Sequence, residues 1–242
     1  MLFKRNINKQ ERTGIRKALL ICGILASLLY IAMNVFMPML YPGYHVASQT
    51  VSELSAVGAP TRTLWFELGI LYTLLVAAFG LGILQSAGEN LLLRTLGILM
   101  LISGIIGLAW SPMHQREVIA AGGETFTDTW HIIMNAITLL LLMLIIGFGA
   151  AGLKKGFRIY SIASMGIFIT FGILTSLEAP GITTNMATPM IGVWERINIG
   201  TYMIWMIVLA VLLMKRERTA LLATTKKNTQ KTKAAIDEQR LK

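Results

Sequence analysis

The chain has 242 residues, of which 55% are hydrophobic and 14% are charged, and its mean hydropathy is +0.64. This composition excludes an ordinary soluble domain, which needs a charged surface, and indicates a protein whose solvent is a lipid bilayer. The formal net charge of +10 would suit a nucleic-acid-binding protein, but the basic residues are sorted by loop, which indicates membrane topology and excludes that class.

Six apolar runs have about the length of 17 to 25 residues that a membrane-spanning helix needs. They lie at 18–38, 64–84, 95–111, 129–151, 159–176 and 194–214. The third and fifth runs are a little short. We therefore expect an all-α integral membrane protein, a bundle of six transmembrane helices.

The segments outside these runs are basic. Residues 1–17 form a basic N-terminus, and the run that follows is long and has no small-x-small cleavage site, so we expect a retained helix and not a signal peptide. Residues 18–214 form the membrane domain. Residues 215–242 are rich in Lys and Thr and have few large apolar residues, so we expect a disordered tail or a frayed helix.

The loops differ in charge. Placing both termini and the even-numbered loops on one side puts 19 of the 22 Lys and Arg residues there and leaves three arginines, Arg62, Arg116 and Arg196, on the other side. This is the positive-inside pattern, which predicts a multi-pass protein of the plasma membrane with cytoplasmic N- and C-termini. The outer side then holds most of the acidic residues and all three histidines.

The first outer segment, "YPGYHVASQTVSELSAVGAP" at 41–60, is polar and contains Ser52 and Glu53. A serine near a histidine and a carboxylate is typical of nucleophilic catalysis. The segment has no G-x-S-x-G elbow, however. The alternative is a capped re-entrant or interfacial helix whose hydroxyls satisfy its own backbone.

The second outer segment leads into "TFTDTWHIIMNAI", where Asp128 and His131 are three residues apart at the start of a helix. That spacing places them on one face, and Thr125 or Thr127 can cap the exposed amides. Asp128 and His131 could act as acid and base, or bind a metal such as zinc with His114 as the third ligand. Alternatively, Asp128 only stabilises the helix N-terminus and His131 fills an interfacial position.

Glu67 lies inside the second apolar run, in "TLWFELGILY", where an ionisable group is costly and needs a partner. Arg196, in "GVWERINIGTY", enters the sixth run at a similar depth. We expect a structural ion pair between Glu67 and Arg196, although a contact of Glu67 with a substrate is an alternative. The neighbouring Glu195 is expected to point elsewhere.

The segments "YPGYHVASQTVSELSAVGAP", "DTWH" and "VWERINIGTYMIW" together resemble a prokaryotic multi-pass membrane family known as domain of unknown function 998. The resemblance extends from the first apolar run to the sixth and implies no established activity. More remotely, the chain is similar to the damage-regulated autophagy modulators and the GPI-anchor remodelling factors. Its Ser, Asp and His residues also resemble those around zinc in the ceramidase and adiponectin-receptor group of membrane hydrolases, but this chain lacks their late pair of histidines.

Three functions follow from these patterns. The first is a non-catalytic binder of a lipid or other small amphiphile, or an accessory membrane protein, with a polar pocket on its outer face. The alternative is a membrane-embedded hydrolase or transferase acting on a lipid-like substrate, with or without a metal, in which His131 and Asp128 are catalytic and Ser52 or Glu53 assists. A transporter is the third. In each case the partners are the bilayer and its lipids, not nucleic acid.

Overall fold

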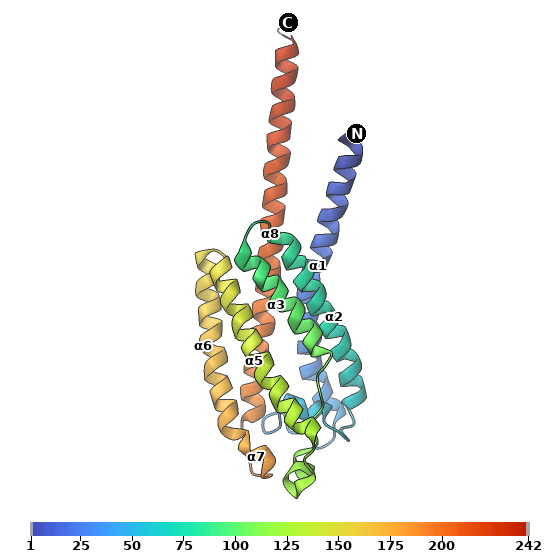
Figure 1. Cartoon of the computed structure of the whole chain (residues 1–242), viewed down its shortest axis with the longest axis vertical. Helices are drawn as coiled ribbons and strands as arrows, with labels where there is room; N and C mark the ends of the chain where they lie inside the picture. The colour runs from blue at the N-terminus through green and yellow to red at the C-terminus, as the bar shows by residue number, and fades with distance from the viewer. Residues whose placement is uncertain (1, 241–242) are drawn as a thin grey trace.

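The computed structural model describes the backbone of residues 2–240 and the side chains of 13–219, together with those of 222 and 230. Within this part of the chain the regular elements are helices (Figure 1). They are α1 (Leu2–Phe36), η1 (Met37–Leu40), η2 (Val51–Ser55), α2 (Arg62–Ser86), α3 (Leu91–Gly107), α4 (Arg116–Val118), η3 (Ile119–Gly123), α5 (Phe126–Gly152), α6 (Lys155–Glu178), α7 (Pro180–Thr183) and α8 (Ile191–Arg240).

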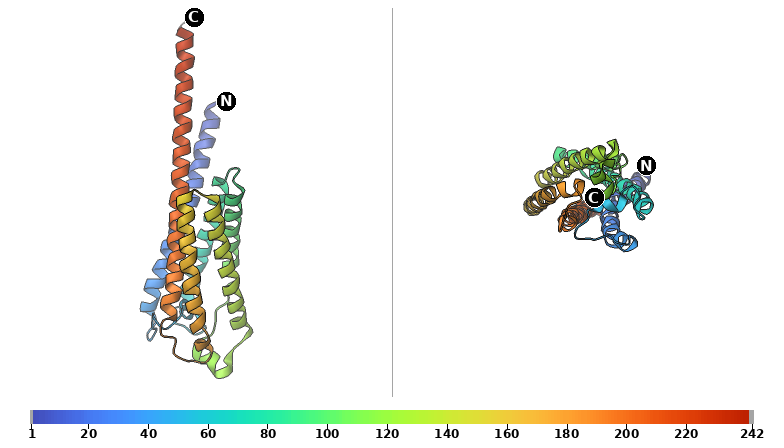
Figure 2. Two further views of the ribbon diagram at one scale, coloured as in Figure 1. Left: turned by 90° about the vertical axis from the view of Figure 1, so that its left-hand side faces the viewer. Right: turned by 90° about the horizontal axis from the view of Figure 1, so that it is seen from below.

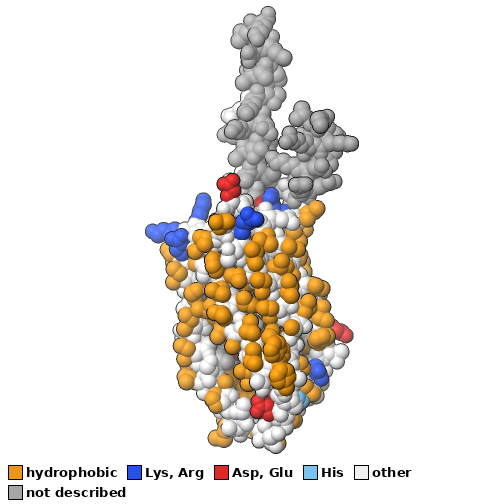
Figure 3. Space-filling view, in the orientation of Figure 1, with side chains coloured by type: hydrophobic (Ala, Val, Ile, Leu, Met, Phe, Trp, Pro, Cys, Tyr) orange, Lys and Arg blue, Asp and Glu red, His pale blue; other side chains and the backbone are white. Residues whose placement is uncertain are grey.

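Five stretches are long and apolar enough to cross a membrane. They are Thr13–Leu40, Arg62–Ser86, Phe126–Gly152, Lys155–Thr183 and Ile191–Thr219. The helix α3 is also apolar but has only 17 residues, and it ends four residues before the run expected at 95–111. Figure 3 shows an apolar band around the middle of the molecule. A continuous apolar surface of this kind is unfavourable in water and favourable in contact with lipid acyl chains, so the chain is a membrane protein.

The long helices form a closed ring in the order α1, α2, α3, α5, α6, α8, with α8 returning to α1 (Figure 2). Glycines allow α2 and α3 to approach closely: a Cβ added at Gly80 would lie 2.7 Å from the backbone nitrogen of Leu101. Small residues at helix contacts are typical of membrane bundles. Buried side chains fill the ring, and two of them, Trp205 and Ser161, are joined by an indole-to-hydroxyl hydrogen bond of 2.9 Å.

The helices α1 and α8 both extend beyond the bundle at one end, which we call the terminal end (Figure 1). In the face shown in Figure 3, most of the described Lys and Arg side chains lie at the edge of the bundle nearest this end. An ion pair between Arg16 and Glu217 connects α1 to α8 there. The short loops between α2 and α3 and between α5 and α6 also lie at this end.

The C-terminal segment differs from the sequence expectation. The helix α8 continues through residues 215–240, where we expected disorder or a frayed helix, and no break occurs at the expected domain boundary after residue 214. The segment is rich in Ala, Leu, Lys, Arg, Gln and Glu, which have high helix propensity and can extend a helix that already exists. The division of the chain into three parts stays a prediction.

Candidate functional site

Three connecting segments come together at the end of the bundle opposite the terminal end. We call residues 41–61, 108–125 and 179–190 the polar cap. The first two segments are paired by a backbone hydrogen bond of 2.8 Å from the amide of Val57 to the carbonyl of Met113. The cap therefore has a defined structure and holds three of the candidate residues, Ser52, Glu53 and His114, while Asp128 and His131 follow it in the first two turns of α5.

At the centre of the polar cap, the carboxylate of Glu53 meets the guanidinium of Arg116. Arg116 donates from Nε to Oε1 at 2.7 Å and from Nη2 to Oε2 at 2.8 Å. Thr50 donates its backbone amide to Oε2 of the same carboxylate at 2.7 Å, and so holds Glu53 at the start of η2. Glu53 is only 3% exposed, so this two-point contact neutralises a charge that is nearly removed from water.

Arg116 also reaches the other two segments of the cap. Its Nη1 donates to the hydroxyl of Thr188 at 3.0 Å, and its Nη2 donates to the carbonyl of Ser48 at 3.1 Å. The Thr188 hydroxyl donates to the same Ser48 carbonyl at 2.7 Å. The hydrogen bonds to Glu53 raise the pKa of Arg116, which therefore stays charged. One buried side chain thus holds all three segments together.

The sequence analysis did not identify Arg116 or Thr188 as site residues. A signal was present, because Arg116 was one of only three basic residues assigned to the acidic side of the topology. A cation placed against the positive-inside bias needs a specific reason. Its partner could not be chosen from the sequence, since Glu53 lies 63 positions away.

Ser52 and His131, both candidate catalytic residues, lie next to each other. The distance between Ser52 Oγ and His131 Nε2 is 3.1 Å, and that between His131 Nδ1 and the carbonyl oxygen of Ser111 is 2.6 Å. A carbonyl only accepts, so Nδ1 carries a proton. In the neutral ring Nε2 is then the acceptor for the Ser52 hydroxyl. His131 is 3% exposed and faces the interior of the protein.

Asp128 is not part of this pair. Its carboxylate accepts hydrogen bonds from the backbone amide of His114 at 2.6 Å and from that of Thr125 at 2.9 Å, and it lies 2.9 Å from His114 Nδ1. Asp128 therefore caps α5 and fixes the preceding loop. The i, i+3 spacing predicted a shared face with His131, but the carboxylate turns toward the free amides at the helix start.

The structure corrects the proposed three-ligand metal site. The three residues belong to two separate pairs. His114 is bonded to Asp128, whereas His131 is bonded to Ser52. Among the residues whose side chains are described, no group of three or more His, Cys, Asp or Glu is placed to hold a metal ion. The expected zinc ligands are thus not brought together.

The proposed ion pair between Glu67 and Arg196 is also wrong. Glu67 is exposed on α2, whereas Arg196 donates to the carbonyls of Val46 and Gly192 at 2.8 and 3.0 Å and to the Tyr44 hydroxyl at 2.6 Å. Burial raises the pKa of Tyr44 to about 12, so its hydroxyl stays protonated. The helix α1 contacts both α2 and α8 and lies between them in the ring.

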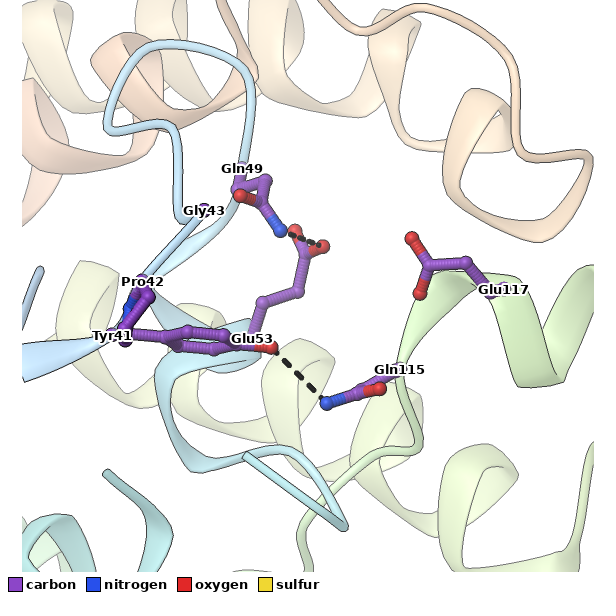
Figure 4. Close-up of a pocket in the computed structure, with 7 residues that line it drawn as sticks. All are labelled: Tyr41, Pro42, Gly43, Gln49, Glu53, Gln115 and Glu117. Atoms are coloured by element: carbon purple, nitrogen blue, oxygen red, sulfur yellow. Dashed lines mark hydrogen bonds between the residues drawn. The ribbon is translucent and has the colours of Figure 1, made fainter. Parts of the chain in front are cut away.

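A cavity of about 250 Å³ opens beside the ion pair and is lined by Tyr41, Pro42, Gly43, Gln49, Glu53, Gln115 and Glu117 (Figure 4). Gln115 donates to the Tyr41 hydroxyl at 3.1 Å, and Gln49 donates to Glu53 at 3.2 Å. The carboxylate of Glu117 faces that of Glu53 across the cavity (Figure 4). The lining is thus polar, with acceptor oxygens from two segments of the cap.

A comparison with protein-family models matches residues 24–212 to the family described as "Protein of unknown function (DUF998)". The chain belongs to this family. The match covers the apolar helices from α1 to α8 and the whole polar cap, as the resemblance of the sequence motifs implied. Searches among curated proteins and among solved structures gave no match. The more remote similarity to autophagy modulators and GPI-anchor remodelling factors stays a prediction.

Proposed function

We propose that this DUF998 protein crosses the plasma membrane six times, with both termini in the cytoplasm and the polar cap outside. The clustering of Lys and Arg at the terminal end supports this orientation. The helix α3, although short, would span about 25 Å at 1.5 Å per residue, and its polar flanks make up the remaining distance to the interface. Six crossings put both termini on one side.

In this position the protein binds a small polar ligand or a lipid headgroup in the cavity of the polar cap. The observation that carries this proposal is the cavity itself. Arg116 binds Glu53, which lines the cavity, and Thr188 in a second segment of the cap, so it fixes the segments around the cavity. Because the Glu53–Arg116 pair needs no further partner, the lining can hold its shape without a ligand. Such preorganisation lowers the cost of binding.

The lining favours a ligand that donates hydrogen bonds and carries positive charge. Glu53 is neutralised by Arg116, but Glu117 is exposed and forms no hydrogen bond or ion pair with another described side chain, so the cavity keeps one uncompensated carboxylate. The ring of Tyr41 adds an aromatic surface that attracts cations. An ammonium group, as in an ethanolamine headgroup, satisfies both features and is the ligand class that we propose.

The experiment compares lipid retention by wild type and Glu117→Gln. Both are reconstituted in nanodiscs containing equal amounts of phosphatidylethanolamine and phosphatidylglycerol, and bound lipid is measured by native mass spectrometry. We expect wild type to retain phosphatidylethanolamine and Glu117→Gln to retain it roughly tenfold less, the effect of about 1.4 kcal/mol. Glu67→Gln is the matched control, since it removes an exposed glutamate outside the cavity. Equal retention of both lipids by wild type would contradict the proposal.

A further inference from the structure

The pairing of Ser52 with His131 carries an inference beyond ligand binding. We propose that Ser52 is a nucleophile and His131 its general base, and that together they cleave an ester of a lipid in the outer leaflet. The proposal rests on the geometry of these two side chains and on their place at the membrane interface. It does not depend on the ligand of the cavity.

The geometry is that of an activated serine. A hydroxyl is a weak nucleophile until an adjacent base accepts its proton, and Ser52 Oγ lies 3.1 Å from His131 Nε2. The hydrogen bond of 2.6 Å from Nδ1 to the Ser111 carbonyl leaves Nε2 free to accept. The Ser111 carbonyl takes the place that a carboxylate has in a triad, so Ser111 is a positioning residue.

The surroundings of the pair suit a lipid ester. His131 is in the second turn of α5, near its loop end, and Trp110 packs edge-on against its ring with centroids 5.1 Å apart. Tryptophan is typical of the membrane interface, where the ester bonds of glycerolipids lie. Ser52 is half-buried, whereas His131 is buried.

The reaction needs only the ester and water. Ser52 Oγ attacks the ester carbonyl carbon while its proton passes to His131 Nε2. The tetrahedral intermediate then collapses, the bond between the carbonyl carbon and the alkoxy oxygen breaks, and the proton on Nε2 passes to the leaving alkoxide, which departs as the alcohol. Water then attacks the acyl carbon while Nε2 accepts its proton, the bond between the acyl carbon and Ser52 Oγ breaks, and the proton on Nε2 returns to Oγ, which releases the fatty acid and regenerates Ser52.

The two other polar pairs nearby are distinct from this pair. Asp128 is bonded to His114 and Thr125, and Glu53 is bonded to Arg116. Among the described side chains, neither carboxylate forms a hydrogen bond or an ion pair with His131. Of the four candidate catalytic residues, we therefore retain Ser52 and His131, and we assign structural roles to Asp128 and Glu53.

The test uses the full chain in nanodiscs and an alkyl fluorophosphonate, which forms a covalent bond with activated serines. The labelled residue is located by mass spectrometry of peptides. We expect the label on Ser52 in wild type, and a labelling rate roughly 100-fold lower in His131→Gln, the lower end of the usual range for general-base catalysis. Ser55→Ala is the matched control, because Ser55 is in the same η2 turn and its hydroxyl donates to the Ser52 carbonyl at 3.0 Å.

The outcomes separate the alternatives. Labelling of Ser52 that depends on His131 and survives Ser55→Ala supports the proposal. Wild-type protein without label on Ser52, or a His131→Gln variant that is folded and labels at the wild-type rate, overturns it. Whether Ser52 is labelled is measured in the wild type alone, so the proposal can be refuted even if a variant fails to fold. Glu117→Gln should label normally, which distinguishes this site from the cavity.

Discussion

Glu53 and Arg116, which lie 63 positions apart, form a two-point ion pair with hydrogen bonds of 2.7 and 2.8 Å in the interior of the polar cap. The Glu53 side chain is 3% exposed and that of Arg116 is 10% exposed. Through Thr188 and the Ser48 carbonyl, the same guanidinium holds the third segment. The three segments of the cap, including the η2 turn that contains Ser52, are thus joined at one guanidinium.

Breaking the pair should destabilise the protein strongly. Arg116→Ala leaves the Glu53 carboxylate buried without its partner, and a loss of about 3–5 kcal/mol is expected for such a change. Unfolding in detergent, followed by intrinsic fluorescence, measures it. Arg62→Ala removes an exposed arginine at the same end and should change stability by less than about 0.5 kcal/mol. Equal effects of the two changes would contradict the role of Arg116.

The coupling can be measured directly. Because Glu53 and Arg116 share one contact, Glu53→Ala and Arg116→Ala together should cost clearly less than the sum of the two single changes. The difference is read from a double-mutant cycle in the same unfolding assay. Additive losses would mean that the two residues act independently.

Glu67 and Arg196 should behave in the opposite way. Arg196→Ala removes the donors to Val46, Gly192 and the Tyr44 hydroxyl and should lower the unfolding temperature, whereas Glu67→Gln should have little effect because Glu67 is exposed. The exchange of the two residues, Glu67→Arg with Arg196→Glu, should recover no stability. Recovery would show that the two side chains meet after all.

Asp128 should act as a cap and not as a metal ligand. Asp128→Ala frees the amides of Thr125 and His114, so we expect a loss of about 1–2 kcal/mol and faster amide hydrogen exchange in the peptides that contain residues 113–115 and 125–129. Thr127→Ala is the control, since Thr127 is exposed and its hydroxyl, within the described part of the chain, bonds only the Thr125 hydroxyl. Zinc that stays bound to wild type and is lost from Asp128→Ala would refute this assignment.

The topology is tested with reporter fusions at Gly122 and at the C-terminus. Gly122 is exposed and has a φ of +81°, which places it in a turn at the edge of the polar cap where an insertion is tolerated. The two fusions should give opposite signals, outside for Gly122 and cytoplasmic for the C-terminus. The same signal from both positions would overturn the proposed six-crossing topology, and a cytoplasmic signal from Gly122 would place the cavity in the cytoplasm.

The sequence by itself determined the features that depend on residues close together in the chain, namely the apolar segments and the helix starts. Hydropathy over windows of about 20 residues located the apolar part of each long helix, because the free energy of transfer into lipid adds up residue by residue, but it did not show that α1 and α8 continue beyond their apolar parts. The motif around "SELSA" indicated the family, and the family match confirmed it. A helix start at Asp128, capped by Thr125 or Thr127, was predicted for the same reason, since capping involves residues close in sequence, and the structure shows Thr125 as the cap.

Only the tertiary structure decided which polar groups meet. The spacing of Asp128 and His131 allowed either joint action or a separate capping role for Asp128, and in the structure one bonds His114 and the other Ser52. Glu67 was assigned to Arg196 by depth, while Arg196 is occupied by backbone carbonyls and Tyr44. A buried polar group bonds whichever partner the fold brings within about 3 Å. For Arg116 that partner is Glu53, which comes within reach only because the three segments of the polar cap fold together over the ends of the helices.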